Sequence, residues 1–242
     1  MRFKAYAATV TGPRHQRLHQ ENQDAVLVRI WRDQWLAVVS DGMGSRLHAD
    51  IGSQMACASV CHIVRGSKFN EPDRSLILSI YRNWLHRLGH IEPDDAAATC
   101  LFAWGLRTGE TRLFQLGDGA IFYHTNRFGS IKNSDEMKFS NETTGLGISR
   151  KMSDWMCDRV TLSDPTHAVA LMTDGISDDL VNEEQLLPIL YTSLNKKSPR
   201  LGKKWLKKQL YDWDTPHHTD DKTIALVYRI PDVRHLFIKK AP

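Results

Sequence analysis

The sequence predicts an α+β fold in which antiparallel strands dominate and two amphipathic helices cover them. Short segments rich in β-branched and aromatic residues alternate with polar, glycine-containing turns, and two longer segments carry apolar residues at three- and four-residue spacing. No repeat, low-complexity tract or Pro/Gly/Ser linker interrupts this pattern. A chain of 242 residues, 41% of them hydrophobic, can bury a substantial core, so one domain over residues 1–242 is expected.

The predicted strands are short and are separated by turn residues. In the middle of the chain, the turns at Thr108-Gly109 and Gly117-Asp118-Gly119 predict that successive strands pair antiparallel. The predicted strands cover residues 5–10, 24–30, 35–40, 99–106, 111–116, 120–124, 167–172 and 222–230.

The two predicted helices each have an apolar side that should lie against a sheet. The first runs from about Leu47 to Val64, with Gly66 as its stop, and the second begins at Asp73, a good N-cap residue. Their apolar sides consist of Ile51, Met55, Ala58, Cys61 and His62 in the first helix and of Leu76, Ile77, Ile80, Trp84 and Leu88 in the second.

A further segment, between Leu194 and Leu210, is strongly basic and contains no acidic residue. Leu201, Trp205, Leu206 and Leu210 predict the buried side of a helix whose other side is solvated lysine and arginine. A docking surface for an acidic or phosphorylated partner is the alternative interpretation of this charge.

The bulk composition excludes several classes of protein. The formal net charge of +4 is too weak to predict nucleic acid as a partner. No apolar run is long enough to span a membrane, and the N-terminus lacks the apolar stretch of a signal peptide. The four cysteines include no CxxC pair, which argues against a structural zinc site. A cytoplasmic protein without membrane association is expected.

Aspartates recur at the ends of the predicted strands, most of them beside a glycine or a second acid. They are Asp24, Asp41, Asp118, Asp174 and Asp220, with Asp178 one helical turn after Asp174. A single Asp-Gly is an ordinary turn, but carboxylates that gather together repel one another unless they are protonated or neutralised. Their co-location therefore predicts bound hard cations, such as Mg²⁺ or Mn²⁺, or strongly perturbed pKa values.

In order along the chain, these motifs resemble those of the PPM or PP2C-like metal-dependent protein phosphatases, in an atypical bacterial branch. The matching motifs are His15 with Glu21-Asn22-Gln23-Asp24-Ala25, Asp41-Gly42-Met43-Gly44, Leu116-Gly117-Asp118, Thr173-Asp174-Gly175-Ile176-Ser177-Asp178 and Asp220-Asp221-Lys222-Thr223. The resemblance implies a four-layer α-β-β-α sandwich, in which two packed antiparallel sheets are flanked by helices.

The resemblance also implies roles for the aspartates. Asp41 would bridge two divalent cations, Mn²⁺ or Mg²⁺. The Gly42 carbonyl would bind one of them, and Asp174 and Asp220 would bind the other. Asp24 would orient the bridging water that attacks phosphorus, which makes Asp24, Asp41 and Asp174 the implied catalytic residues. Two such cations lower the pKa of the water and orient the phosphoryl group for in-line attack.

Other positions match the family less closely. In many bacterial relatives, the positions of Asp118, Asp174 and Asp178 hold a third, weaker metal. Gln23 stands where many members place a metal-binding glutamate, and it offers a neutral carbonyl oxygen instead.

The phosphate-binding group is also changed. His19 stands where the family places an arginine, so Arg14 or Arg17 could substitute. Met43 stands where eukaryotic relatives have a proton-donating histidine, and Ser45 replaces a glycine. His217 and His218 are interpreted as polar loop residues, with metal or phosphate binding as the alternative.

The leading functional hypothesis is metal-dependent hydrolysis of phosphoserine or phosphothreonine on proteins, opposite a bacterial serine/threonine kinase. The departures at His19, Gln23 and Ser45 keep a second hypothesis open, a pseudophosphatase that binds phosphoproteins as a scaffold. A third hypothesis is a metallonuclease, because clustered acids and a basic helix also suit phosphodiester cleavage.

Overall fold

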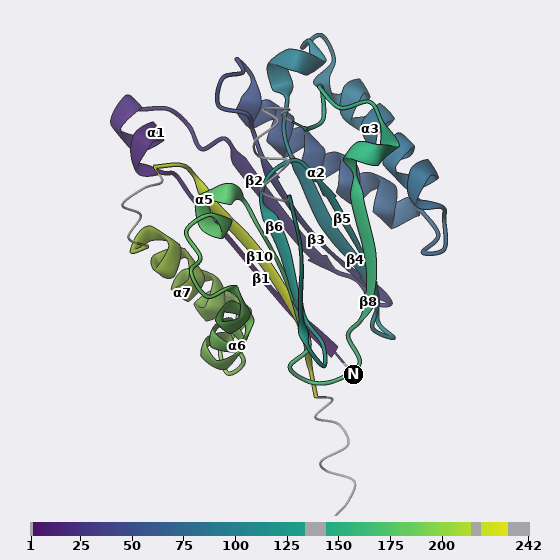
Figure 1. Cartoon of the computed structure of the whole chain (residues 1–242), viewed down its shortest axis with the longest axis vertical. Helices are drawn as coiled ribbons and strands as arrows, with labels where there is room; N and C mark the ends of the chain where they lie inside the picture. Colours follow the sequence, from purple (N-terminus) through teal and green to yellow (C-terminus); the bar gives the residue numbers. More distant parts are fainter. Residues whose placement is uncertain (1, 134–143, 214–218, 232–242) are drawn as a thin grey trace, which may run out of the picture.

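The computed structural model describes residues 2–133, 144–213 and 219–231, and two five-stranded antiparallel sheets form its centre (Figure 1). The first sheet has the order β1-β10-β9-β6-β7, and the second has the order β2-β3-β4-β5-β8. The strands are β1 (Arg2–Val10), β2 (Asp24–Ile30), β3 (Gln34–Asp41), β4 (Cys100–Leu106), β5 (Glu110–Leu116), β6 (Ala120–His124), β7 (Phe128–Lys132), β8 (Met156–Thr161), β9 (Ala168–Met172) and β10 (Lys222–Ile230).

Helices cover both outer faces, which confirms the four-layer α-β-β-α sandwich. On one side, α2 and α3 pack on the β2-β3-β4-β5-β8 sheet, and on the other side α6 and α7 pack on its partner (Figure 1). The α-helices are α1 (Pro13–Leu18), α2 (Ala49–Gly66), α3 (Asp73–Leu88), α5 (Asp174–Ser177), α6 (Glu183–Leu194) and α7 (Pro199–Tyr211), and short 3₁₀ helices are η1 (Pro93–Ala96) and η2 (Met152–Asp154).

Strand β3 shows why the centre of the sandwich is apolar on both faces. Its Leu36 and Val38 point toward α2 and α3, whereas Trp35, Ala37 and Val39 point into the layer between the sheets. All five are at most 1% exposed. Because successive side chains of a strand alternate between faces, a strand covered on both sides reads as a continuous apolar run.

Helix α3 has the predicted buried side, whereas the buried side predicted for α2 is only partly right, because Ile51, Met55 and Cys61 pack against the core without being fully buried. In α2 the fully buried residues include Gly52, Ala56 and Val60, whereas Ile51 is only half-buried and His62 is exposed. The helix packs against the sheet on one side and against α3 on another. It therefore buries small residues where its backbone comes close to the sheet and to α3. An apolar stripe in the sequence does not reveal such residues.

Asp73 is not the N-cap of α3, contrary to the prediction. Pro72 occupies that position, and Asp73 forms ion pairs with Arg112 and Arg159. The Arg112 side chain is 1% exposed, so its charge has to be matched by a nearby carboxylate and by the aromatic faces beside it.

The turn at Gly117-Asp118-Gly119 does not form a hairpin, contrary to the prediction that the strands on either side of it pair. The predicted hairpin at Thr108-Gly109 does pair β4 with β5, but β5 and β6 belong to different sheets. The chain crosses between the layers here, with φ angles of 89° at Gly117 and 106° at Gly119. These backbone conformations favour glycine.

Most of the basic segment forms α7, which begins at Pro199 and buries Gly202, Leu206 and Leu210. Leu201 is 60% exposed, so the predicted buried side was wrong at this residue.

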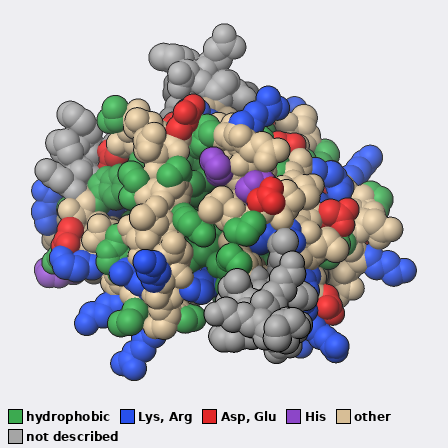
Figure 2. Space-filling view, turned by 90° about the horizontal axis from the view of Figure 1, so that it is seen from below, with side chains coloured by type: hydrophobic (Ala, Val, Ile, Leu, Met, Phe, Trp, Pro, Cys, Tyr) green, Lys and Arg blue, Asp and Glu red, His purple; other side chains and the backbone are tan. Residues whose placement is uncertain are grey.

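The end of the molecule shown in Figure 2 carries scattered lysine and arginine side chains with fewer acids among them. Within the described ranges, no helix is both long and apolar enough to cross a membrane.

Candidate active site

The predicted aspartates meet at one end of the sandwich, at the upper end in Figure 1. Asp24 begins β2 and Asp41 ends β3, where the two residues lie directly opposite each other. Asp174 begins α5, just after β9, and Asp220 lies just before β10. Since β2 and β3 belong to one sheet and β9 and β10 to the other, the aspartates gather where the ends of both sheets meet.

Asp24 is buried and is held across the gap between the sheets. Thr173 donates a hydrogen bond of 2.9 Å from Oγ1 to Asp24 Oδ2, and the Thr173 hydroxyl itself accepts one of 3.1 Å from the backbone of Thr223. The other carboxylate oxygen, Oδ1, is buried without a donor among the described residues. An acceptor in this state needs a partner such as water or a cation.

Backbone hydrogen bonds fix Asp41. Its N–H donates to Thr99 Oγ1 and its carbonyl accepts from the Thr99 N–H, both at 2.8 Å. The carboxylate of Asp41 is thereby held opposite that of Asp24, on rigid β-structure.

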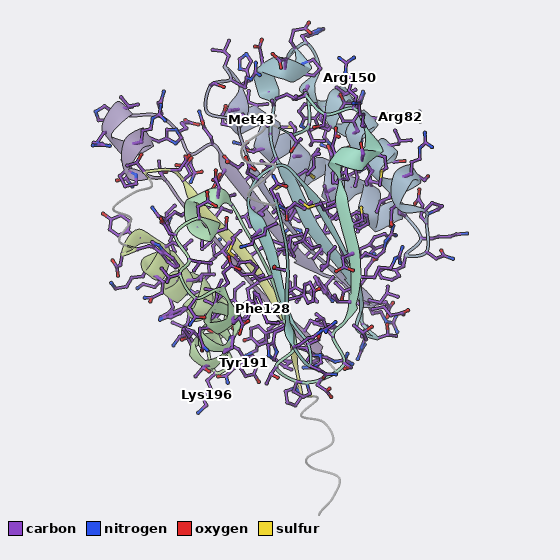
Figure 3. The ribbon with its side chains drawn as sticks, viewed as in Figure 1. Met43, Arg82, Phe128, Arg150, Tyr191 and Lys196 are labelled. Atoms are coloured by element: carbon purple, nitrogen blue, oxygen red, sulfur yellow. The ribbon has the colours of Figure 1, made fainter. Side chains whose placement is uncertain are left out.

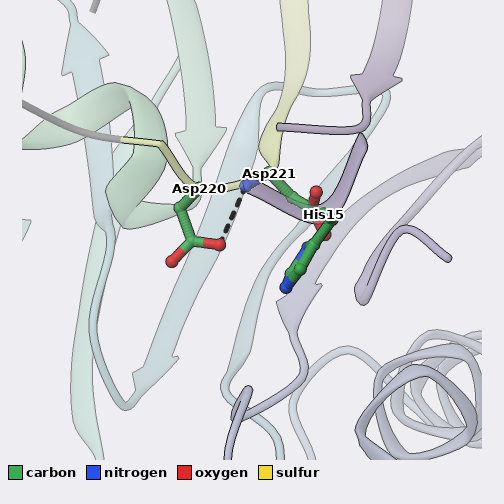
Figure 4. A group of neighbouring side chains, drawn as sticks. All are labelled: His15, Asp220 and Asp221. Carbon is green, nitrogen blue, oxygen red and sulfur yellow. Dashed lines mark hydrogen bonds and ion pairs between the residues drawn. The ribbon is translucent and has the colours of Figure 1, made fainter. Parts of the chain in front are cut away.

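Asp221 is buried and joins three parts of the site, although no role for it was predicted. Its Oδ1 accepts a hydrogen bond from the Gly12 N–H and its Oδ2 accepts one from the Gln23 N–H, both at 2.7 Å. The same Oδ2 lies 3.0 Å from His15 Nδ1 (Figure 4). His15, Asp220 and Asp221 each offer a potential ligand atom within 4.8 Å of the others.

The hydrogen bond from Gln23 to Asp221 changes the ladder between β2 and β3. Beyond the pair Asp24 and Asp41, the register places Gln23 opposite Gly42, and the Gly42 N–H does donate to the Gln23 carbonyl at 3.1 Å. The reciprocal bond of an antiparallel ladder would run from the Gln23 N–H to the Gly42 carbonyl. Because Asp221 takes that N–H, the Gly42 carbonyl has no backbone donor among the described residues.

Two glycines let the segment that carries Asp220 and Asp221 lie close to its neighbours. A Cβ atom at Gly12 would lie 2.2 Å from the Asp220 carbonyl oxygen, and one at Gly175 would lie 2.0 Å from the Asp221 carbonyl oxygen. Both contacts are far shorter than a real Cβ could make. Glycine is therefore required on each side of this segment.

The carboxyl groups raise one another's pKa values. Burial is the largest cause in each of three residues: it raises the pKa of Asp24 to about 7, that of Asp174 to about 6 and that of Asp41 well above its usual range. Among the charged neighbours of these three residues, those that raise the pKa most are all aspartates. A cluster of this kind becomes fully ionised near neutral pH only if cations enter it.

The structure also places the residues predicted for a third metal. Asp118 and Asp178 are exposed, and both raise the pKa of Asp174 through their charge, so they lie around that carboxylate. Asn133 donates a hydrogen bond of 2.7 Å to Asp118. The Gln23 side chain lies against Gly44, where a Cβ atom would be 3.2 Å from Gln23 Oε1.

The predicted phosphate-binding residues lie on or next to α1, which the sequence analysis did not predict as a helix. Arg14, Arg17 and His19 are exposed, and none of them is among the main charges acting on the aspartates. His19 ends the helix in the left-handed conformation, with φ of 55°. His217 and His218 lie outside the described residues.

Residues 11–211 match the family model described as protein phosphatase 2C. The chain therefore belongs to the protein phosphatase 2C family, a family of protein-serine/threonine phosphatases. No curated protein gives a significant match to the sequence.

Solved structures share this fold at low sequence identity. The photosystem II phosphatase PBCP has a TM-score of 0.69 at 13% identity, with 95% of this chain and 99% of that chain covered. Stp1 from Staphylococcus aureus has a TM-score of 0.65 at 18% identity, with 96% of each chain covered. A structure of the PP2C domain and part of the regulatory domain of SpoIIE from Bacillus subtilis has a TM-score of 0.64 at 16% identity, and this chain covers 64% of that chain.

The raised pKa values predict how the stability of the metal-free protein depends on pH. In the folded protein the pKa of Asp24 is about 7 and that of Asp174 is about 6, whereas the pKa of either residue in the unfolded chain is 3.8. The folded state thus binds more protons than the unfolded state between these values, so the free energy of unfolding falls as the pH rises from roughly 4 to 7. Cations that neutralise the cluster should reverse this loss.

Thermal unfolding with EDTA and with Mn²⁺ at pH 5.5 and pH 7.5 tests this expectation. The increase in Tm caused by Mn²⁺ should be larger at pH 7.5. An equal increase at both pH values would mean that these carboxylates are not the groups that respond to the metal. Asp33→Asn, in the exposed loop between β2 and β3, is the matched control and should leave the pH dependence unchanged.

Proposed function

We propose that the chain hydrolyses phosphoserine or phosphothreonine on proteins, with two divalent cations, Mn²⁺ or Mg²⁺, held by Asp41, Gly42, Asp174 and Asp220. One observation carries the proposal: aspartates from both sheets, one of them buried and the others partly buried, converge on one point, and their strongest charged neighbours are other aspartates. A fold that gathers carboxyl groups whose main charged neighbours are other carboxyl groups is suited to bound metal.

The groups present fit hard divalent cations. The donors are carboxylate and carbonyl oxygens, which Mg²⁺ and Mn²⁺ prefer. The Gly42 carbonyl has no backbone donor among the described residues, and Asp24 Oδ1 is buried without a partner there, so both oxygens are available. When bound, two such cations would supply Lewis-acid activation of water and neutralise charge on the phosphate.

The remaining residues position the reactants. Asp24, which Thr173 fixes through Oδ2, would accept a hydrogen bond at Oδ1 from the attacking water and align it with phosphorus. The water adds to phosphorus as the bond to the serine or threonine oxygen breaks, and that oxygen takes up a proton. Met43 offers no proton at this point, so solvent water is the expected donor.

The finer features of the activity belong to the same proposal. A third, weaker metal would be held by Asp118, Asp174 and Asp178, and Gln23 would contribute a neutral oxygen beside Gly44. Arg14, Arg17 or His19 would bind phosphate only if α1 brings one of them over the cluster. The partners would be a bacterial serine/threonine kinase and its phosphorylated targets, in the cytoplasm.

Mn²⁺-dependent release of phosphate from a phosphothreonine peptide tests this function. Asp41→Asn and Asp174→Asn should each lower kcat/KM by about 100-fold or more, because each removes a charged ligand from the pair of metals. Asp33→Asn should remain active. Absence of phosphate release by the native protein with any divalent cation would favour the phosphoprotein-binding scaffold instead, and metal-dependent cleavage of nucleic acid would favour the metallonuclease.

The role of Asp221 gives a second prediction. In Asp221→Asn one acceptor oxygen is lost, so the Gln23 N–H can return to the Gly42 carbonyl and compete with the metal for it. We expect Mn²⁺ binding, measured by titration calorimetry, to weaken about tenfold or more, while kcat at saturating Mn²⁺ changes less than in Asp41→Asn. Unchanged Mn²⁺ affinity in a folded Asp221→Asn protein would contradict this role.

A further inference from the structure

A cavity of about 510 Å³ lies on the α3 side of the sandwich, between that helix and residues 146–155. Its volume is in the range of sites that bind ligands, roughly 300–1,000 Å³. Leu116 and Leu146 line it and are each 1% exposed. Leu78 from α3 and Met152 from η2 also line it, and they are 43% and 37% exposed. The cavity is therefore an apolar hollow that solvent reaches at one side.

The charged residues that line this cavity are all cations. Arg74, Arg150 and Lys151 line it, no acidic residue does, and all three cations are exposed. Among the described residues, none of the three forms an ion pair. An occupant of complementary chemistry has an apolar group for the hollow and negative charge beside it.

Backbone pairing connects the wall of the cavity to the carboxylate cluster. Gly42 pairs with Ala98, and Ala98 pairs in turn with Leu146. Two strand spacings separate Gly42 from Leu146, which is roughly 10 Å. Three extended residues span about that distance. Arg150 also lies at the same end of the molecule as Met43, which follows Gly42 (Figure 3).

We propose that this cavity is a docking site for the phosphoprotein substrate, and that it takes an apolar side chain flanked by acidic residues, a few residues away from the phosphorylated serine or threonine. The inference rests on the proposed function. A peptide fits better than a membrane surface because Leu116 and Leu146 form the buried wall of a hollow, which a single side chain can enter and a flat bilayer cannot. The cations would hold the acidic flank, and the site would contribute to the selection of substrates.

Two phosphothreonine peptides test the site. One carries a leucine between two glutamates, five residues from the phosphothreonine, and the other carries alanine between two glutamines at the same place. We expect the acidic peptide to have a KM at least tenfold lower, with kcat within about twofold, because docking contributes equally to the ground state and the transition state.

Charge reversal localises the effect. The double variant Arg150→Glu with Lys151→Glu should remove the KM advantage of the acidic peptide and leave the hydrolysis of p-nitrophenyl phosphate unchanged. Lys204→Glu, which reverses an exposed cation on α7, is the matched control and should keep the advantage. Fluorescence anisotropy with the unphosphorylated acidic peptide measures the same binding without any turnover.

The outcomes separate the two proposals. Normal hydrolysis of p-nitrophenyl phosphate with equal KM values for both peptides would overturn the docking site alone. If the native protein hydrolysed neither peptide nor p-nitrophenyl phosphate, that result would count against the proposed function. Anisotropy with the native protein and the double variant would still decide whether the acidic peptide binds at Arg150 and Lys151. Binding of the native protein to phosphatidylserine vesicles, without binding of the peptide, would assign the surface to a membrane and overturn the peptide assignment.

Discussion

The mutual repulsion of carboxylates that gather where two sheets meet is the constraint on which the rest of the site depends. Asp24 and Asp41 face each other across one ladder, and Asp174 and Asp220 approach them from the other sheet. Burial raises the pKa values of Asp24, Asp41 and Asp174, so the cluster holds protons in the absence of metal. The sandwich supplies the rigidity that keeps these groups together in spite of that cost.

Around this cluster, the fold assigns separate tasks to neighbouring residues. Thr173 and Thr223 fix one oxygen of Asp24, and the other has no hydrogen-bond partner within the described ranges. Asp221 lies beside Asp220 in the sequence, yet it turns inward to bind the backbone of Gly12 and Gln23. By taking the Gln23 N–H, it leaves the Gly42 carbonyl without a backbone donor in the described parts of the chain. Two adjacent aspartates can thus differ in role, since one faces the cluster and the other organises the chain that surrounds it.

Local sequence patterns predicted the elements whose packing is simple. Helix α3 packs through one apolar stripe, and its five buried residues were predicted in full, whereas α2 is covered on two sides and buries small residues that no stripe marks. The Gly117-Asp118-Gly119 segment has turn chemistry, but that chemistry does not specify which sheet the next strand joins. The roles of Asp221 and Thr173 depend on contacts between residues 149 to 209 positions apart, which spacing along the chain cannot reveal.

The central claim is that the cluster is a site for two divalent cations that displace protons as they bind. Calorimetric titration of the metal-free protein with Mn²⁺ at pH 7, in buffers of different ionisation enthalpy, measures stoichiometry and proton release together. The account predicts two equivalents of bound metal and a net release of protons in the native protein, with both reduced in Asp41→Asn. Absence of binding, or binding without proton release that is unaffected by Asp41→Asn, would contradict it.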